Sequence, residues 1–464
     1  MSNLEQPYIV GLDIGTTKIV CIAAQKNERG LLKILGLGKS ESHGIVNGEV
    51  LNINETQKSI IKAVEACKKS CSNINIEINE VYVGIAGGHI KSDIVYEKLK
   101  REKPHEPIAK EDLDTLMDRV YQTDIGVSNK IITVISEGFI IDDTHQVNND
   151  KILGCTGKEI DAMYHVISGD SAQINKMFTV VEKSGLKIKE LYLQPLASKI
   201  AVTTNIDDEA GVAVLDIGGG TSDLTVVIDN QFKHTCVIPV GGLQITEDIR
   251  KLGMIKAQAE KLKIEFGSAI AIESYRNKFI AIPALAGLKS LEINQYELST
   301  VINKRMSEIL DKISTCLTDL DVLNRLSYGI IITGGGALLQ NLKQLVECKL
   351  GLSCRIGYAN CYVATEHNSD IEKELKQPFY ATCIGLILLA YENIDLTDLK
   401  LFTQEQVEKE VEDEQKIEIE EKEFVHQPEL NTNNKDLKRR VDFFGNIKRG
   451  LLDLFKEEKD TKIN

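Results

Sequence analysis

The chain has 464 residues, of which 42% are hydrophobic, which is ordinary for a globular protein of about three domains. Its 55 Lys and Arg against 69 Asp and Glu give a net charge of −14, which argues against a surface that neutralises nucleic-acid phosphates. The longest apolar run, residues 379–391, is too short to span a bilayer, and the N-terminus lacks a secretory signal pattern. We therefore expect a cytoplasmic protein that does not bind nucleic acid.

Cysteine and histidine spacing points to structural roles. The ten cysteines include no C-x-x-C pair, which favours buried reduced thiols over disulfides or a zinc knuckle. His89, His165 and His234 lie near apolar runs, and we expect them to be hydrogen-bonded histidines, not metal ligands.

Up to about residue 398, short β-branched runs alternate with longer amphipathic stretches, the pattern of a mixed α/β protein. Residues 8–24 and 211–228 share one design, in which an apolar strand ends in an Asp, a Gly-rich turn follows, and a second apolar strand begins. This internal repeat predicts two similar halves, built around Asp13 and Asp216. A third junction, residues 328–342, predicts a strand, a turn of three glycines and a helix.

The glycine turns favour an anion site. In the first, Gly15 to Lys18 offers backbone amides, two hydroxyls and an ammonium; in the second, Gly218 to Ser222 offers mostly amides. A carboxylate aimed at a phosphate needs a cation between them, which predicts Mg²⁺ near Asp13 and Asp216. Each turn alone also fits ordinary turn chemistry, so the prediction depends on their combination. The chain has no Walker A loop, and its first two Gly turns lead into strands, unlike a dinucleotide-binding fingerprint.

This combination resembles the superfamily of actin, heat-shock ATPase chaperones and sugar kinases. Within it, the chain is similar to the bacterial cell-division FtsA family over about residues 7–392. The segments that carry the resemblance are LDIGTTK (12–18), VYVGIAGGHIKS (81–92), LDIGGGTSD (215–223), IPVGGLQITEDI (238–249), ITGGGALLQNL (332–342) and QPFYATCIGL (377–386).

The resemblance implies an α/β, two-lobed actin-like ATPase fold that binds ATP and Mg²⁺, with Asp13 and Asp216 at the metal. Glu260 and Lys263 would contact the nucleoside, although their spacing also fits a solvated ion pair. The implied ATP-binding residues are Gly11, Asp13, Gly15, Thr16, Thr17, Lys18, Asp216, Gly218, Gly219, Gly220, Thr221, Glu260, Lys263, Gly334, Gly335 and Gly336.

Gln194 is the candidate catalytic residue, because the superfamily often places a Gln or Glu at a strand-to-helix junction to orient water. Its amide cannot take up a proton, so we expect slow Mg-dependent ATPase activity at most. A plain helix-start role before Pro195 is the alternative.

Inserted subdomains complete the implied organisation. The resemblance predicts a first lobe at 1–87 and 167–208, and a second lobe at 209–241 and 311–398. It predicts a self-assembly subdomain at 88–166 and a nucleotide-capping subdomain that binds the C-terminal peptide of FtsZ at 242–310. An acidic linker (399–436) and an amphipathic membrane-targeting tail (437–464) would follow.

The linker and tail are also visible in the residues themselves. Residues 405–423 hold ten acidic residues and three lysines, which predicts a disordered, solvated linker. Residues 441–458 form an amphipathic helical pattern flanked by cations, which favours a helix lying on anionic lipid over one packed on its own domain. The expected membrane-binding residues are Phe443, Phe444, Ile447, Lys448, Arg449, Leu451, Leu452, Leu454 and Phe455.

The resemblance thus predicts a protein that self-assembles at the cytoplasmic face of the inner membrane at the division site and tethers the FtsZ ring there. Its partners would be FtsZ, further copies of itself, anionic lipids and later division proteins. A small-molecule kinase and a pilus-assembly relative of the same superfamily are the alternatives. A heat-shock chaperone is disfavoured, because too few residues follow position 398 for a peptide-binding domain.

Overall fold

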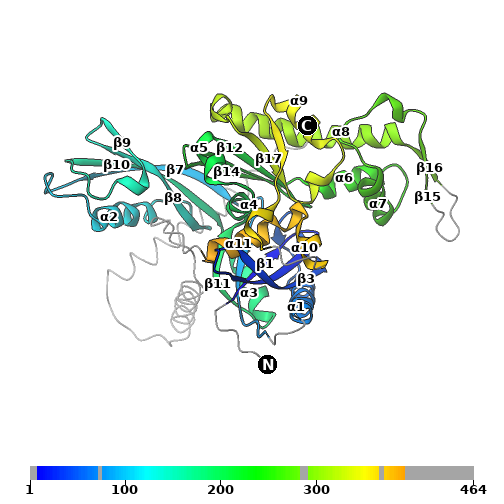
Figure 1. The fold of residues 1–464 in the computed structure, drawn as a ribbon, viewed down its shortest axis with the longest axis horizontal. Helices are drawn as coiled ribbons and strands as arrows, with labels where there is room; N and C mark the ends of the chain where they lie inside the picture. The colour runs from blue at the N-terminus through cyan, green and yellow to red at the C-terminus, as the bar shows by residue number, and fades with distance from the viewer. Residues whose placement is uncertain (1–7, 72–75, 283–290, 365–369, 392–464) are drawn as a thin grey trace, which may run out of the picture. The chain divides into compact units, whose positions relative to one another are not determined.

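The computed structural model describes residues 8–71, 76–282, 291–364 and 370–391 (Figure 1). The predicted linker at 399–436 and tail at 437–464 lie outside the described residues. Within the described part of the chain, no helix combines the length and apolarity needed to cross a bilayer.

Two five-stranded sheets form the framework of the fold. In the first, the strand order is β11-β6-β1-β2-β3, and helices α1 and α3 pack on one face (Figure 1). The elements are β1 (Ile9–Ile14), β2 (Lys18–Lys26), β3 (Leu32–Glu41), β6 (Glu80–Ile85), β11 (Lys187–Leu193), α1 (Ile53–Ser70) and α3 (Ser171–Lys183).

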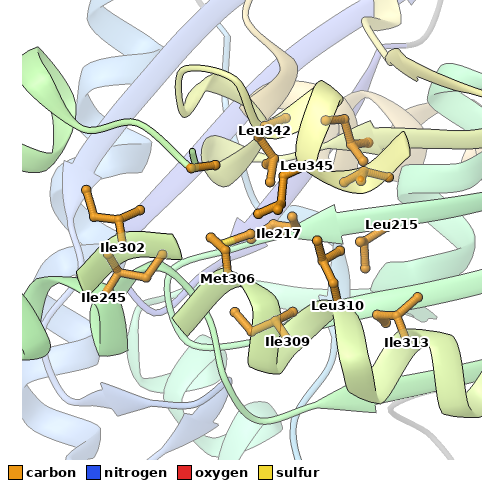
Figure 2. Packing of buried hydrophobic residues seen from close by; sticks show 14 of the residues in the cluster. Leu215, Ile217, Ile245, Ile302, Met306, Ile309, Leu310, Ile313, Leu342 and Leu345 are labelled. Carbon is orange, nitrogen blue, oxygen red and sulfur yellow. The ribbon is translucent and has the colours of Figure 1, made fainter. Parts of the chain in front are cut away.

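The second sheet has the order β14-β13-β12-β17-β18. The long helix α8 and helix α9 cover one face, where Leu215 and Ile217 of the sheet meet Met306 and Leu310 of α8 (Figure 2). The elements are β12 (Val212–Ile217), β13 (Ser222–Ile228), β14 (Gln231–Ile238), β17 (Gly329–Thr333), β18 (Cys354–Ile356), α8 (Gln295–Asp319) and α9 (Leu342–Leu350).

The two sheets are built alike. In each, the strand that carries the key aspartate is the middle strand: β1 pairs antiparallel with β2 and parallel with β6, and β12 pairs antiparallel with β13 and parallel with β17. Asp13 and Asp216 are each the last but one residue of their strand. The predicted pair of similar halves is confirmed, and with it the mixed α/β fold class.

Helices α4 (Gln194–Val202) and α11 (Ala381–Tyr391) connect the two halves. They belong to one buried cluster that includes Val20 and Ile22 from β2 and Val212 and Val214 from β12. The helices cross so closely that a Cβ added to Gly385 would lie 1.8 Å from the carbonyl oxygen of Ala197. The apolar run at 379–391 is therefore a buried core helix, because both of its sides face protein.

A four-stranded sheet of order β7-β10-β8-β9 with helix α2 is inserted between β6 and β11 and has its own core. It comprises β7 (Lys91–Lys100), α2 (Lys110–Tyr121), β8 (Asn129–Ile141), β9 (His145–Val147) and β10 (Glu159–Asp170).

A second insertion joins α6 (Gly242–Arg250), α7 (Lys256–Phe266), β15 (Phe279–Ile282) and β16 (Leu291–Asn294) to α8. The remaining strands and α-helices of the described residues are β4 (Ile45–Val46), β5 (Glu49–Val50), α5 (Asn205–Ala210) and α10 (Asp370–Leu375). The subdomain boundaries given above stay predictions.

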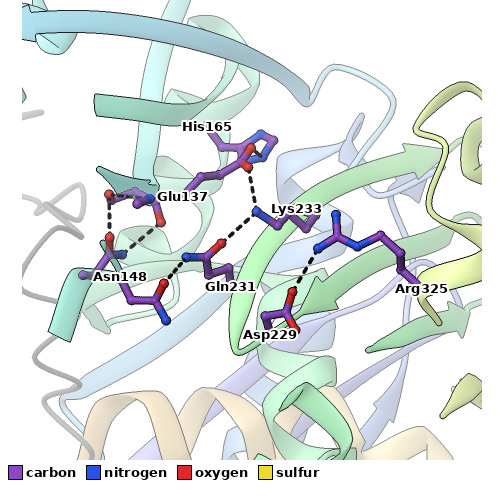
Figure 3. Close-up of polar contacts among 10 residues, drawn as sticks. Glu137, Asn148, His165, Asp229, Gln231, Lys233 and Arg325 are labelled. Atoms are coloured by element: carbon purple, nitrogen blue, oxygen red, sulfur yellow. Dashed lines mark hydrogen bonds and ion pairs between the residues drawn. The ribbon is translucent and has the colours of Figure 1, made fainter. Parts of the chain in front are cut away.

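A polar network joins the inserted sheet to edge strand β14 (Figure 3). Lys233 of β14 donates to Glu137 of β8 over 3.1 Å, and His165 of β10 contacts the same carboxylate. Burial alone would raise the pKa of Glu137, but the His165 ring and the Lys233 ammonium outweigh it, so this pKa is lowered. Gln231 of β14 extends the network to Asn148 over 2.9 Å.

Candidate functional site

A cavity of about 490 Å³ lies where the predicted glycine turns meet. Both hairpin turns, the triple-glycine turn after β17 and the helices α6, α7 and α8 contribute to its lining. Of the implied ATP-binding residues, the cavity brings together Asp13, Gly15, Thr16, Thr17, Lys18, Asp216, Gly218, Gly219, Gly220, Thr221, Glu260, Lys263, Gly334, Gly335 and Gly336.

Gly11 does not line the cavity. It lies within β1, and a Cβ there would stand 2.9 Å from both the carbonyl oxygen of Cys383 and Cγ1 of Ile387. Its small size is needed for the close approach of α11 to β1, which is a packing role. A sequence motif cannot separate this role from ligand contact, because both require a residue without a side chain.

The two hairpin turns touch each other across the cavity. A Cβ at Gly219 in the second turn would lie 2.3 Å from Cγ2 of Thr17 in the first. In the first turn, Gly15 donates its N–H to the carbonyl oxygen of Lys18, and the Thr16 hydroxyl accepts the N–H of Gly48 over 3.0 Å. Both turns therefore line one common space.

Three buried carboxylates face this space. Asp13, Asp216 and Asp223 are 8%, 9% and 5% exposed, and each lines the cavity. Burial raises the pKa of all three; the neighbouring Lys18 partly offsets this rise for Asp13, and hydrogen bonds from Ser198 and Thr382 partly offset it for Asp216.

Lys18 is a nearby cation, and its environment weakens its charge. Its Nζ lies 3.2 Å from the centroid of the Phe379 ring. Burial lowers the pKa of Lys18, although the carboxylates of Asp13 and Asp216 oppose this effect. The cavity lining holds four carboxyl groups, Asp13, Asp216, Asp223 and Glu260, against three lysines, Lys18, Lys39 and Lys263.

The donor set fits a magnesium ion. Carboxylate oxygens are the ligands that Mg²⁺ prefers, and it usually keeps several waters. Oδ1 of Asp223 is buried without a hydrogen-bond partner among the described residues. Asp216 accepts hydrogen bonds from Ser198 over 2.5 Å and from Thr382 over 3.1 Å, which hold its carboxylate in place. Asp223 was missed by the sequence analysis, although it lies within the quoted motif LDIGGGTSD.

Apolar side chains also line the cavity: Leu338 and Leu339 follow the triple-glycine turn, and Ile264 and Met306 come from α7 and α8. Gly334 has φ +79°, and a Cβ there would stand 2.1 Å from Oδ1 of Asp216. The turn therefore also approaches the carboxylate of Asp216 closely, which only a glycine permits. This geometry suits a flat, apolar ligand whose charged end reaches the hairpins.

Lys263 and Glu260 also line the cavity. Lys263 Nζ donates to Glu260 over 2.8 Å and to the Gly242 carbonyl and the Thr246 hydroxyl over 2.9 Å each. The i,i+3 ion pair considered from the sequence is present; its Lys263 side chain is 15% exposed and its Glu260 side chain 38% exposed, so only the lysine end is largely shielded from water. Burial lowers the pKa of Lys263, and Glu260 opposes this shift.

Gln194 begins α4 and reaches into the cavity. Its Nε2 donates to Oδ1 of Asp13 over 3.1 Å and to the Gly84 carbonyl over 3.3 Å. Pro195 occupies the first turn of the helix, as the alternative helix-start role requires. The structure therefore accommodates both roles at once.

Sequence reasoning did not assign several other lining residues. Lys39, Gly242, Leu243, Phe379 and Thr382 come from segments without a phosphate-binding pattern of their own. The motifs around Gly242 and Thr382 were quoted only for their family resemblance, so tertiary packing was needed to place them in the cavity.

Fold and site together define an actin-like protein of two similar α/β halves with a cavity between their hairpin turns. The fold is similar to a solved structure titled "PilM-PilN type IV pilus biogenesis complex", with a TM-score of 0.60 and 14% sequence identity, over 82% of this chain and 98% of that one. At this identity the likeness shows the fold alone.

Sequence comparisons assign the family. The family model "Cell division protein FtsA" matches residues 213–385, and the model "SHS2 domain inserted in FTSA" matches residues 87–168. The cell division protein FtsA of Neisseria meningitidis is 31% identical over 82% of this chain and 90% of its own length. FtsA of Escherichia coli is 26% identical over 82% of this chain and 90% of its own length. The chain belongs to the FtsA family of cell-division proteins.

Proposed function

We propose that the cavity binds ATP with Mg²⁺. The observation that carries this proposal is the convergence of both Asp-ended hairpins and the triple-glycine turn on one cavity whose carboxylates outnumber its cations. The turn amides and Lys18 would hold the phosphates, and the apolar side chains of the lining together with Lys263 would hold the adenosine. Asp13, Asp216 and Asp223 would hold Mg²⁺, which supplies the positive charge that the phosphates require.

Turnover is expected to be slow. Gln194 would orient water near Asp13, but an amide cannot accept a proton at neutral pH. The bound nucleotide would thus act mainly by holding the two halves together, because each hairpin belongs to a different sheet.

Nucleotide binding is tested with two lysines of α7. Lys263 lines the cavity, whereas Lys261 is 71% exposed and forms an ion pair with Glu265. Loss of a hydrogen bond to a charged group costs about 1.5–3 kcal/mol, so Lys263→Met should weaken binding of a fluorescent ATP analogue by about 10- to 150-fold. Lys261→Met should leave it within about twofold. Equal affinities for the two variants would place the nucleotide elsewhere.

The finer cell-division role is a tether. In this proposal the protein self-assembles at the cytoplasmic face of the inner membrane, its tail lies in anionic lipid, and the subdomain at 242–310 receives the C-terminal peptide of FtsZ. Family membership supports this role, as does the amphipathic pattern of residues 441–458 beside the cations Lys438, Arg439 and Arg440.

Co-sedimentation with anionic liposomes tests the tether. The full chain should pellet with vesicles, and a chain ending at Asn434 should stay in solution. Both are compared with and without Mg-ATP, because assembly that depends on nucleotide should increase the pelleted fraction of the full chain. If neither protein pellets, the tether proposal fails, and phosphorylation of a panel of sugars and acetate would then test the kinase alternative.

A further inference from the structure

A group of potential metal ligands lies between β14, the edge strand of the second sheet, and helix α8. A ring nitrogen of His234 and the Sγ atoms of Cys236 and Cys316 all lie within 4.8 Å of one another. His234 and Cys236 are two residues apart on β14, where alternate side chains share a face. Cys316 comes from the C-terminal part of α8, which packs on that face.

This group differs from the expectation, drawn from the sequence, that His234 is a hydrogen-bonded histidine and not a potential metal ligand. The partner that completes the group is 82 positions further along the chain (316 − 234), and only the packing of α8 on the sheet brings it close. The H-x-C spacing on one strand was the available sequence signal. It is weak, because two ligands do not define a metal site.

The distances suit a tetrahedral metal ion. With Zn–S bonds of about 2.3 Å, two thiolates at the tetrahedral angle stand about 3.8 Å apart. The Sγ atoms of Cys236 and Cys316 are 3.7 Å apart. A disulfide would need them at about 2.05 Å and would leave His234 without a part in the chemistry. All three residues are partly buried, so the site is sheltered but reachable from solvent.

We propose that His234, Cys236 and Cys316 form a binding site for Zn²⁺ or a similar thiophilic divalent metal, with a fourth position left for water. His and Cys are the ligands that zinc prefers, and three protein ligands with one open position are a common zinc arrangement. The ion would cross-link edge strand β14 to α8.

The position gives the site a consequence for the structure. The His234 ring is 6.5 Å from that of His165 on β10, and the neighbouring Lys233 holds Glu137 of the inserted sheet (Figure 3). Strand β14 also pairs with β13, where Cys236 is opposite Leu224. The residue before Leu224 is Asp223, which lines the cavity proposed to bind the nucleotide. A metal here would stiffen the strand between the inserted sheet and that cavity.

The test uses the full-length protein, reduced and kept free of oxygen. Titration with Co²⁺ should give visible bands of tetrahedral cobalt and near-ultraviolet thiolate-to-cobalt bands, at one ion per chain, and Zn²⁺ should displace the cobalt. Cys236→Ser, Cys316→Ser and His234→Ala should each weaken Zn²⁺ binding, measured against a chromophoric chelator, by at least the roughly 10- to 100-fold that loss of an outer-shell partner costs.

Cys348→Ser is the matched control, since it removes an exposed thiol from α9 of the same half and leaves the three ligands in place. Its Zn²⁺ affinity should equal that of the unaltered chain. Far-ultraviolet circular dichroism checks that each variant is folded, and the cobalt spectrum of the unaltered chain is a test that needs no variant. Absence of thiolate-to-cobalt bands in the unaltered chain, or equal Zn²⁺ affinity in folded Cys316→Ser and Cys348→Ser variants, would refute the site. If the protein is found with a Cys236–Cys316 disulfide, and reducing that disulfide gives no Zn²⁺ binding, the site is refuted as well.

Discussion

The triple-glycine turn offers a sharp test of the site geometry, because adjacent glycines differ in surroundings. Gly334 has φ +79°, and an added Cβ would meet Oδ1 of Asp216 at 2.1 Å; an added Cβ at Gly335 meets nothing within 4 Å. With ψ 177° as well, Gly334 is in a backbone region that is adopted almost only by glycine and that costs another residue about 1–3 kcal/mol. Forcing a methyl group into a packed site costs about 1–3 kcal/mol more.

We therefore expect Gly334→Ala to lower the free energy of unfolding by about 2–6 kcal/mol. Gly335→Ala should change it by about 1 kcal/mol or less, since it removes only the flexibility of the unfolded chain. Guanidinium unfolding of both variants, followed by circular dichroism, compares their midpoints with that of the unaltered chain. Equal midpoints for the two variants would show that the turn does not pass over Asp216 as described.

Two more predictions concern the helix pair and the carboxylates. Gly385→Ala should destabilise the protein despite the ~1 kcal/mol that helix propensity favours, because its Cβ would lie 1.8 Å from the Ala197 carbonyl; a higher unfolding midpoint would contradict the close crossing of α4 and α11. Burial raises the pKa of Asp13, so folding favours the protonated carboxyl group. The resulting contribution to the free energy of unfolding is present below the unfolded pKa and is lost as pH rises through the folded pKa. Mg²⁺ requires the ionised carboxylate, so the rise in melting temperature caused by Mg-ATP should increase from about pH 6 to about pH 8, and Asp13→Asn should flatten this dependence. A rise that is independent of pH in both proteins would remove Asp13 from the metal site.

The family and the internal repeat could be predicted from the sequence because both depend on local patterns. An apolar strand that ends in Asp and leads through glycines to another strand has the same local design at Asp13 and at Asp216, and both became hairpins of a middle strand. Backbone propensity and turn chemistry act over a few residues, so short motifs suffice to determine them.

Other features depended on which distant segments pack together. Gly11 and Gly219 look alike in sequence, yet one admits helix α11 and the other admits the opposite hairpin turn. Likewise, Cys316 meets His234 and Cys236 only because α8 lies across the second sheet. The sequence alone determined the strands, the turns and the family, because these follow from neighbouring residues. The tertiary structure decided which side chains share a cavity or a cluster, because such contacts depend on how helices and sheets far apart in the chain pack against one another.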